Sequence, residues 1–410
     1  MSDVLVSYDF PPMIGGAHSW LYEIYRRWPT DVDVLAANYS ENESEADRQR
    51  SFDRMAHGAL RVARRADTTH QIDLRSYHYL RSVWHHASQI GRLVESHRTS
   101  GAEIGVIHAL RAFPEGVAAW LYWRRNRRKR RLVTYVHGEE ILVSKTSRQL
   151  AMLANRVYQD SDLVIANSEN TRKILATTYS GVESVSIHPG VDIKRFSHVG
   201  DLGEAYRAAR GWPPETVVVL TLARMEPRKN HAMVIRAITK LRAEGLPVGL
   251  ICGGDGPERE ALETLASELN VAPWVQFTGS ISEEEKPRLF SSADIFAMPS
   301  VSVGAMIEGF GIVFLEAAAA GLPTVCGNSG GQEEAVLNGK SGFAVDGESL
   351  EAVANAIKRL AGNSDLRRAF GDAGRLWAAE NDWEILGDKV QSAVRDVARA
   401  RVHDKRTIQR

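Results

Sequence analysis

Residues 306–334 read MIEGFGIVFLEAAAAGLPTVCGNSGGQEE, and the rest of the chain is best understood from this stretch. Glu308 lies in a turn between glycines. The residues from Ile312 to Ala320 are apolar or small apart from Glu316, and they predict a helix that a glycine and a proline then end. A short strand over 324–326 and a second glycine turn over 327–331 follow. Turns, helices and strands in this order indicate an α/β fold.

The same stretch has the chemistry of a nucleotide-sugar site. A glycine turn that opens a helix leaves backbone N–H groups unpaired at the positive end of the helix dipole, which suits phosphate. Carboxylates would be repelled by phosphate, so we expect them to contact neutral, hydroxyl-rich parts of the ligand. Glu316 suits a ribose, and Glu308 suits a second sugar or the edge near the phosphates. The residues predicted to bind this ligand are Phe310, Gly311, Ile312, Val313 and Glu316.

A purely structural interpretation is an apolar helix buried in an α/β core, with both glutamates as partners of the helix dipole. It accounts for the alanines but not for a charged Glu316 between Leu315 and Ala317. The functional interpretation is therefore favoured.

The motif Glu-x7-Glu, followed by G-x-P and S-G-G, resembles the donor-site signature of retaining GT-B glycosyltransferases of the family 4 type. The segments EGFGIVFLEAAAAGLP and GNSGG are most similar to those of the phosphatidylinositol-mannoside mannosyltransferases and their bacterial relatives. This resemblance runs from Gly15-Gly16 to Gly331 and implies two Rossmann-like domains facing a cleft. One departure is Gly330-Gly331-Gln332-Glu333-Glu334, which lacks the proline that often follows the second glycine turn.

The length and composition of the chain fit a globular protein of two domains. The chain has 410 residues, 44% hydrophobic content and a net charge of +0, so no global field draws it to nucleic acid. Its two cysteines, Cys252 and Cys326, indicate neither a disulfide nor a metal site. The sequence shows no basic-then-apolar leader and no run of about eighteen apolar residues. We expect a cytoplasmic protein.

The resemblance divides the chain into four parts. Residues 1–195 form an N-terminal, acceptor-side Rossmann-like domain, and residues 196–213, which lack periodicity, form a linker. Residues 214–382 form the nucleotide-sugar-binding domain, and residues 383–410 form a helix that crosses back to the first domain.

In the first half, Gly15 and Gly16 follow a strand and precede a helix. A bare glycine pair is ordinarily a tight turn, but in the resembled family this loop faces the donor phosphates and the acceptor. His137 follows the apolar run 132–136. A lone histidine is ordinarily satisfied by local hydrogen bonds; here the resemblance places it beside the reacting sugar carbon.

In the second half, Arg224 and Lys229 follow the strand predicted over 217–223. Such loop cations are commonly only solvent-exposed, but the family's R-x4-K phosphate pair falls on these two positions, where they would neutralise a diphosphate. Gly254 follows the strand over 247–252 and permits a nucleotide to lie against the backbone.

Residues 124–131 hold seven cations among eight residues. Cations suit a helix C-terminus, but these exceed what capping needs. With Trp120, Tyr122 and Trp123 upstream, they also suit an anionic membrane surface, which would make the enzyme peripheral on the inner face of the plasma membrane. No nucleic-acid-binding motif accompanies them.

The resemblance implies hexosyl transfer with retention, by a front-face path without a metal or cofactor. Arg224, Lys229 and the helix N-terminus would stabilise the leaving diphosphate, while His137 and Glu308 would act near the transferred sugar. GDP-mannose is the favoured donor, with UDP-glucose or UDP-N-acetylglucosamine second. The acceptor would be a glycan, a lipid-linked polyol or a small molecule. The alternatives are a nucleotide-sugar binding protein that has lost catalysis, and a GT-B epimerase or phosphorylase.

Overall fold

The computed structural model describes residues 2–13, 15–38, 43–55, 57–65, 77–99, 104–126, 130–197, 203, 207 and 211–407. The chain forms two compact units, which are described separately below. Unit 1 comprises Met1–His188 with Trp383–Arg410, and unit 2 comprises Pro189–Asp382.

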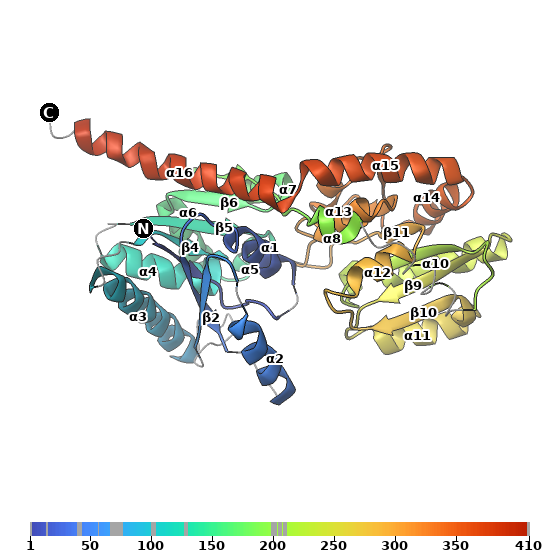
Figure 1. Ribbon diagram of the computed structural model, residues 1–410, viewed down its shortest axis with the longest axis horizontal. Coiled ribbons are helices and arrows are strands. Elements are labelled where there is room, and N and C mark those ends of the chain that lie inside the picture. Colours follow the sequence, from blue (N-terminus) through green and yellow to red (C-terminus); the bar gives the residue numbers. More distant parts are fainter. Residues whose placement is uncertain are drawn as a thin grey trace. The chain divides into compact units, whose positions relative to one another are not determined.

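Unit 1 is built on a seven-stranded sheet with the order β3-β2-β1-β4-β5-β6-β7, and every strand pairing among its described residues is parallel. Figure 1 labels β2, β4, β5 and β6 of this sheet. The strands are β1 (Ser2–Val6), β2 (Val32–Ala37), β3 (Leu60–Arg65), β4 (Ile104–Ala109), β5 (Arg131–Val136), β6 (Leu163–Ala166) and β7 (Val185–Ser186). The helices are α1 (Gly16–Tyr25), α2 (Glu43–Arg54), α3 (Tyr77–Thr99), α4 (Val117–Arg125), α5 (Glu139–Ser144), α6 (Arg148–Asp160), α7 (Glu169–Thr178) and α16 (Trp383–Thr407), with a short π-helix, η1 (Ala112–Gly116).

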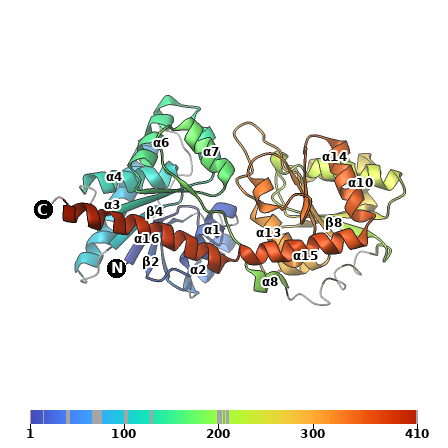
Figure 2. The same cartoon turned by 90° about the horizontal axis from the view of Figure 1, so that it is seen from above.

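Successive residues of a strand point to opposite faces of a sheet. Both faces of the unit 1 sheet carry buried apolar side chains, and helices cover each face. Val4 and Val6 of β1 belong to the core cluster that α3, α4 and α6 complete. On the other face, Trp20 of α1 contacts Tyr135 of β5 edge to face, with ring centroids 5.2 Å apart. Helix α16 packs against α1, so the C-terminal segment joins the layer that covers this second face (Figure 2).

Unit 2 repeats the architecture with a six-stranded sheet of order β10-β9-β8-β11-β12-β13. Its strands are β8 (Val217–Leu222), β9 (Val248–Gly253), β10 (Val275–Gly279), β11 (Ile295–Met298), β12 (Thr324–Gly327) and β13 (Gly342–Val345). Its helices are α8 (Ile193–Ser197), α10 (His231–Ala243), α11 (Arg259–Glu268), α12 (Lys286–Ser291), α13 (Ile312–Ala320), α14 (Leu350–Ala361) and α15 (Ser364–Glu380), with 3₁₀ turns η2 (Pro227–Lys229), η3 (Ala272–Trp274) and η4 (Gln332–Ala335).

Unit 2 also has a core on each face of its sheet. Helices α10 and α14 pack against the face that carries Val217 and Val219. Helices α8, α12 and α13 pack against the face that carries Val218 and Leu220. Two parallel α/β sheets confirm the predicted fold class, and α13 has the bounds predicted for its helix.

The division between the units differs from the predicted boundary at residue 195. Residues 189–195 belong to unit 2, where Val191 donates a backbone hydrogen bond to Asn381 O at 3.0 Å and Phe196 packs on Phe290. Most of the predicted linker 196–213 lies outside the described residues: 198–202, 204–206 and 208–210.

In both units the strand order reverses direction beside the first strand, at β1/β4 and at β8/β11. In open parallel sheets, ligands bind at the carboxyl ends of the strands next to such a switch point. We therefore expect ligand-binding residues in the loops that follow β1, β4 and β5 of unit 1. In unit 2 we expect them in the loops that follow β8, β9, β11 and β12.

Candidate functional site

The loops after four neighbouring strands of unit 2 carry most of the predicted site residues. Gly254 follows β9, Arg224 and Lys229 follow β8, and Glu308 lies in the long loop after β11. The glycine turn 327–331 follows β12. Because these strands are adjacent in the sheet, their carboxyl ends bring segments about a hundred residues apart in sequence to one edge.

Glu308 is held on both its side chain and its backbone. Its carboxylate accepts hydrogen bonds from Lys229 Nζ and, at 3.2 Å, from Arg228 Nη1. Its side chain is only 10% exposed. Its carbonyl oxygen accepts a hydrogen bond from Gly331 N at 2.8 Å, and a Cβ on Gly330 (φ +74°) would lie 2.4 Å from that oxygen. A residue with a side chain would not fit at position 330, so glycine allows the second turn to pack directly against the backbone of Glu308.

The charge state of Glu308 follows from these contacts. Burial by itself would raise the pKa of the carboxyl group, but the charges and hydrogen bonds of Lys229 and Arg228 outweigh burial and lower its pKa below the usual value. Glu308 is therefore an ionised hydrogen-bond acceptor at neutral pH.

Helix α13 begins directly beyond this carboxylate. Gly311, with φ +86°, caps it in a left-handed conformation that favours glycine. Ile312 and Val313 form its first turn and are half-buried, and the N–H groups of a first turn lack intrahelical partners. The side chain of Phe310 is buried in the core, with 2% exposure, so only its backbone is suited to face a ligand.

Glu316, also on α13, has a charged partner that the sequence did not reveal. Lys286 Nζ lies 3.1 Å from one carboxylate oxygen of Glu316 and 3.5 Å from the other. Lys286 comes from α12, which packs against α13. The dipole-partner interpretation of Glu316 is thus replaced by a specific ion pair.

The two predicted phosphate-binding cations differ in their surroundings. Lys229 is 13% exposed and is engaged with Glu308, whereas Arg224 is 71% exposed. Glu226 lies between the cations, 3.3 Å from Arg224 Nε and 3.3 Å from Arg228 Nε. Arg228 is the cation that sequence reasoning missed, and its place beside Lys229 in the turn η2 was the available signal.

Packing within the protein, and not only the approach of a ligand, requires glycine at position 254. Its φ is +112°, and a Cβ there would lie 2.2 Å from Ala223 O at the end of β8. Its N–H donates to Gly279 O at 2.9 Å. Gly254 therefore lets three strand ends meet closely at the edge where the ligand is expected.

In unit 1, His137 follows β5 and precedes Gly138, whose φ is +105°. Its Nε2 donates to Leu110 O at 2.8 Å, which leaves Nδ1 as the hydrogen-bond acceptor of the ring. Burial lowers the pKa of His137 to about 4, and the nearby charge of Arg111 also lowers it. The ring is therefore neutral at physiological pH, with a fixed tautomer.

The glycine pair of unit 1 belongs to a larger polar cluster at the same sheet edge. Gly15 caps α1, and a Cβ on Gly15 would lie 2.4 Å from the ring of His18. In the preceding loop, Asp9 forms an ion pair with Arg111, which follows β4. Burial raises the pKa of Glu115, which lies 3.5 Å from Arg111, to about 7. Gly16 begins α1 itself. His18, Arg111 and Glu115 carried no motif and were missed.

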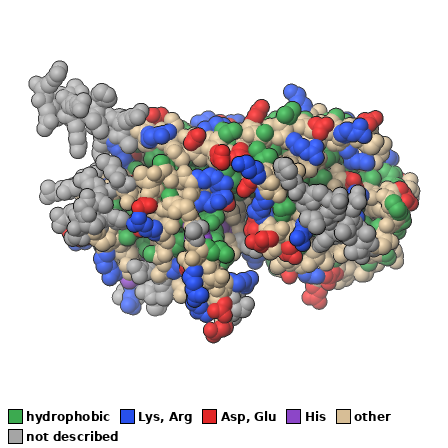
Figure 3. Space-filling view, viewed as in Figure 1, with side chains coloured by type: hydrophobic (Ala, Val, Ile, Leu, Met, Phe, Trp, Pro, Cys, Tyr) green, Lys and Arg blue, Asp and Glu red, His purple; other side chains and the backbone are tan. Residues whose placement is uncertain are grey.

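The basic run 124–131 is only partly described, because Arg127, Arg128 and Lys129 lie outside the described residues. Arg124 lies 3.7 Å from Asp160, and Arg131 forms an ion pair of 2.7 Å with Asp162. The aromatic residues expected to accompany the run at a membrane are instead core residues: Trp120, Tyr122 and Trp123 are all less than 10% exposed. On the face shown in Figure 3, Lys and Arg are interspersed with Asp and Glu.

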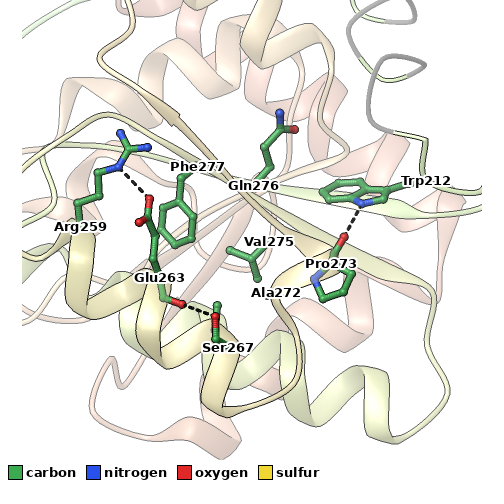
Figure 4. A pocket seen from close by; sticks show the side chains of 10 residues that line it. Trp212, Arg259, Glu263, Ser267, Ala272, Pro273, Val275, Gln276 and Phe277 are labelled. Carbon is green, nitrogen blue, oxygen red and sulfur yellow. Dashed lines mark hydrogen bonds and ion pairs between the residues drawn. The ribbon is translucent and has the colours of Figure 1, made fainter.

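A hollow of about 510 Å³ lies beside β10, the edge strand of the unit 2 sheet (Figure 4). Trp212, Arg259 and Phe277 line it, and the Trp212 indole donates to Pro273 O at 2.9 Å. Its lining contains none of the predicted site residues. Across the residues that the structure describes, no three metal-ligating side chains form a group suited to an ion, and no helix has the length and apolar character to cross a membrane.

Comparisons with known proteins show the family of the chain. The family model of glycosyltransferase family 4 matches residues 14–195, and that of glycosyl transferases group 1 matches residues 203–377. The chain is 34% identical to the GDP-mannose-dependent alpha-(1-6)-phosphatidylinositol monomannoside mannosyltransferase of Mycolicibacterium smegmatis, over 94% of this chain and 96% of that protein. It is 29% identical to the D-inositol 3-phosphate glycosyltransferase of Corynebacterium jeikeium, over 74% of each chain.

Two solved structures share the fold. Anabaena HepE in complex with UDP and glucose has a TM-score of 0.76 at 20% identity, covering 97% of this chain and 100% of that one. Sucrose-phosphate synthase from Thermosynechococcus elongatus has a TM-score of 0.77 at 21% identity, covering 97% and 99%. With these relatives and its two parallel α/β sheets, the chain belongs to the family 4 glycosyltransferases and has the GT-B fold.

Proposed function

We propose that this glycosyltransferase moves a mannosyl group from GDP-mannose to a hydroxyl group of its acceptor, with retention of configuration. The observation that carries the proposal is the Glu308 loop, in which an ionised carboxylate, two cations and the glycine-capped start of α13 lie at one sheet edge. The choice of GDP-mannose rests on the mannosyltransferase of M. smegmatis, which is named for that donor.

Unit 2 would hold the donor through complementary charges. The exposed Arg224 and the ammonium group of Lys229 would donate to the diphosphate, together with the backbone at Ile312 and Val313. An ammonium group has three donors, so Lys229 can keep Glu308 and also bind a phosphate oxygen. Glu316 would accept the ribose hydroxyls, and Glu308 would accept hydroxyls of the transferred sugar.

The proposed path is front-face and needs no metal, since the protein's own cations would stabilise the leaving diphosphate. That diphosphate would take the proton of the attacking acceptor hydroxyl as the new glycosidic bond forms on the face from which the diphosphate departs. His137, neutral and with Nδ1 as acceptor, would orient groups near the anomeric carbon. Gly15 and Gly16 would let the donor phosphates and the acceptor approach the backbone.

The acceptor is proposed as a lipid-linked polyol or glycan, because the M. smegmatis relative is named for a phosphatidylinositol monomannoside. Contact of residues 124–131 with an anionic membrane belongs to this proposal. The solvent-exposed end of a helix remains the competing interpretation of these residues, given the acidic partners of Arg124 and Arg131.

A second candidate, which the mannosyltransferase relatives do not favour, is a UDP-glucose- or UDP-N-acetylglucosamine-dependent transferase. Thermal-shift measurements with GDP, UDP, ADP and dTDP separate the two. A nucleotide that fills the site at about 100 times its dissociation constant adds roughly 2.7 kcal/mol to the free energy of unfolding. A shift with GDP, followed by mannosyl transfer from GDP-mannose in the presence of EDTA, supports the proposal. A shift with UDP and not with GDP overturns the choice of mannose.

A further inference from the structure

The carboxylate of Glu316 stands at the end of a chain of alternating charges within unit 2. Lys286 Nζ lies 3.1 Å from Glu316 Oε1 and 2.8 Å from Glu283 Oε1. Glu283 in turn pairs with Arg195 of α8 at 2.9 Å, and its carbonyl oxygen accepts from the same guanidinium. Three elements that pack against one another, α8, α12 and α13, therefore contribute to one network.

The network is buried at the Glu316 end and open to water at the other. The side chains of Glu316 and Lys286 are 10% and 19% exposed, whereas those of Arg195 and Glu283 are 30% and 49% exposed. An ionised carboxylate in the interior is costly unless it has a charged, hydrogen-bonded partner. Among the described residues, Lys286 is the cation paired with Glu316.

The geometry leaves room for a ligand. A carboxylate has about four acceptor positions, and Lys286 approaches mainly one oxygen, so the remaining positions can accept ribose hydroxyls. Burial lowers the pKa of the Lys286 ammonium, but the charges of Glu316 and Glu283 outweigh burial and raise it above its usual value. Lys286 is therefore a permanent cation.

We propose that Lys286 is a positioning residue that holds the Glu316 carboxylate oriented for the ribose hydroxyls of the donor, with Glu283 and Arg195 fixing Lys286 in turn. This inference rests on the proposed function, in which Glu316 accepts the ribose. It assigns the recognition of ribose to the pair Lys286–Glu316 rather than to the glutamate alone. Without Lys286, the Glu316 carboxylate loses the hydrogen-bonded partner that fixes its orientation, and the site loses its aligned hydroxyl acceptor.

The test compares Lys286→Met, Lys286→Arg and the wild-type chain by calorimetry with GDP and with 2′,3′-dideoxy-GDP, and in parallel with the two uridine counterparts. The ratio of the two affinities reports ribose recognition and is insensitive to a general loss of binding. The matched control is Lys240→Met, which removes a lysine–glutamate pair (Lys240–Glu351) elsewhere in unit 2. Melting of each unliganded variant checks that it is folded.

The wild-type chain is expected to bind the ribonucleotide at least about tenfold more tightly than the dideoxynucleotide, as for hydrogen bonds to a charged group. Lys286→Met should abolish this preference while leaving dideoxynucleotide affinity within about twofold. Lys286→Arg should restore most of the preference, and Lys240→Met should retain it. A preference that survives in a folded Lys286→Met variant overturns the role of Lys286 alone. A wild-type chain that binds neither nucleotide, or shows no preference for ribose, overturns the ribose assignment and this inference together.

Discussion

Replacing Lys229 by alanine tests the proposed diphosphate site most directly. In the structure Lys229 is 13% exposed and shares Glu308 with Arg228, which lies 3.2 Å from the same carboxylate oxygen. After the substitution Glu308 keeps one charged partner, so it does not become an unpaired buried charge. The substitution should therefore weaken ligand binding more than it lowers the free energy of unfolding.

A hydrogen bond to a charged group contributes about 1.5–3 kcal/mol, which corresponds to a 10- to 150-fold loss of nucleoside diphosphate affinity. Lys229→Ala should lie within this range, because its ammonium acts in a poorly solvated position. Arg224→Ala should lie near or below its lower end, because a side chain that is 71% exposed is screened by water.

Titration calorimetry with GDP and UDP measures both variants, and Lys240→Ala provides a control in an unrelated ion pair of unit 2. A melting temperature close to that of the wild-type chain must accompany each measurement. If both Lys229→Ala and Arg224→Ala bind the nucleotide as tightly as the wild-type chain, these cations do not hold the diphosphate and the reasoning is refuted.

Three further predictions concern other parts of the molecule. His137→Ala should lower turnover far more than affinity for free nucleotide, since its proposed place is beside the transferred sugar; wild-type turnover would contradict this. Because the pKa of Glu308 is lowered by two cations, its contribution to stability is complete above the unfolded value of 4.5 and is lost as the pH falls through the folded value. The melting temperature of Glu308→Gln should therefore decrease less at acidic pH than that of the wild-type chain. If the melting temperatures of both proteins decrease equally with pH, the pairing of Glu308 with its two cations does not contribute to stability. Reversing the charges of Arg127, Arg128 and Arg130 should abolish sedimentation with anionic liposomes at low salt, and unchanged sedimentation would leave the run as a solvated helix end.

The sequence was sufficient for the features that depend on local pattern. The apolar run and its final glycine predicted α13 within its observed bounds, and the order of turns, helix and strand indicated an α/β fold, while the two Rossmann-like domains were implied by the family resemblance. The spacing of Glu308 and Glu316 placed one carboxylate before the helix and one within it. These predictions succeeded because turn chemistry and the end of an apolar run are properties of only a few neighbouring residues.

Expectations that depended on exposure were less secure. The aromatic residues before the basic run looked suited to a membrane surface, but Trp123 donates to Arg130 O at 2.8 Å and Trp120 donates to Asp160 at 2.8 Å inside unit 1. Phe310 likewise faces the core and not a ligand. Periodicity in a short helix does not say which of two apolar faces is covered, because that depends on the neighbouring elements.

The partners of the two glutamates show what a motif leaves open. Glu308 takes its cations from a turn 79 and 80 residues earlier, and Glu316 takes its cation from a helix 30 residues earlier. No spacing rule relates these positions, since the strand order of the sheet brings β8 beside β11 and packing brings α12 against α13. The motif thus fixes where two carboxylates lie on the backbone, while the orientation of each carboxylate is set by side chains from other turns and helices. On the proposal made above, a variant of this chain that keeps both glutamates but loses Lys286 should therefore still lose its recognition of ribose.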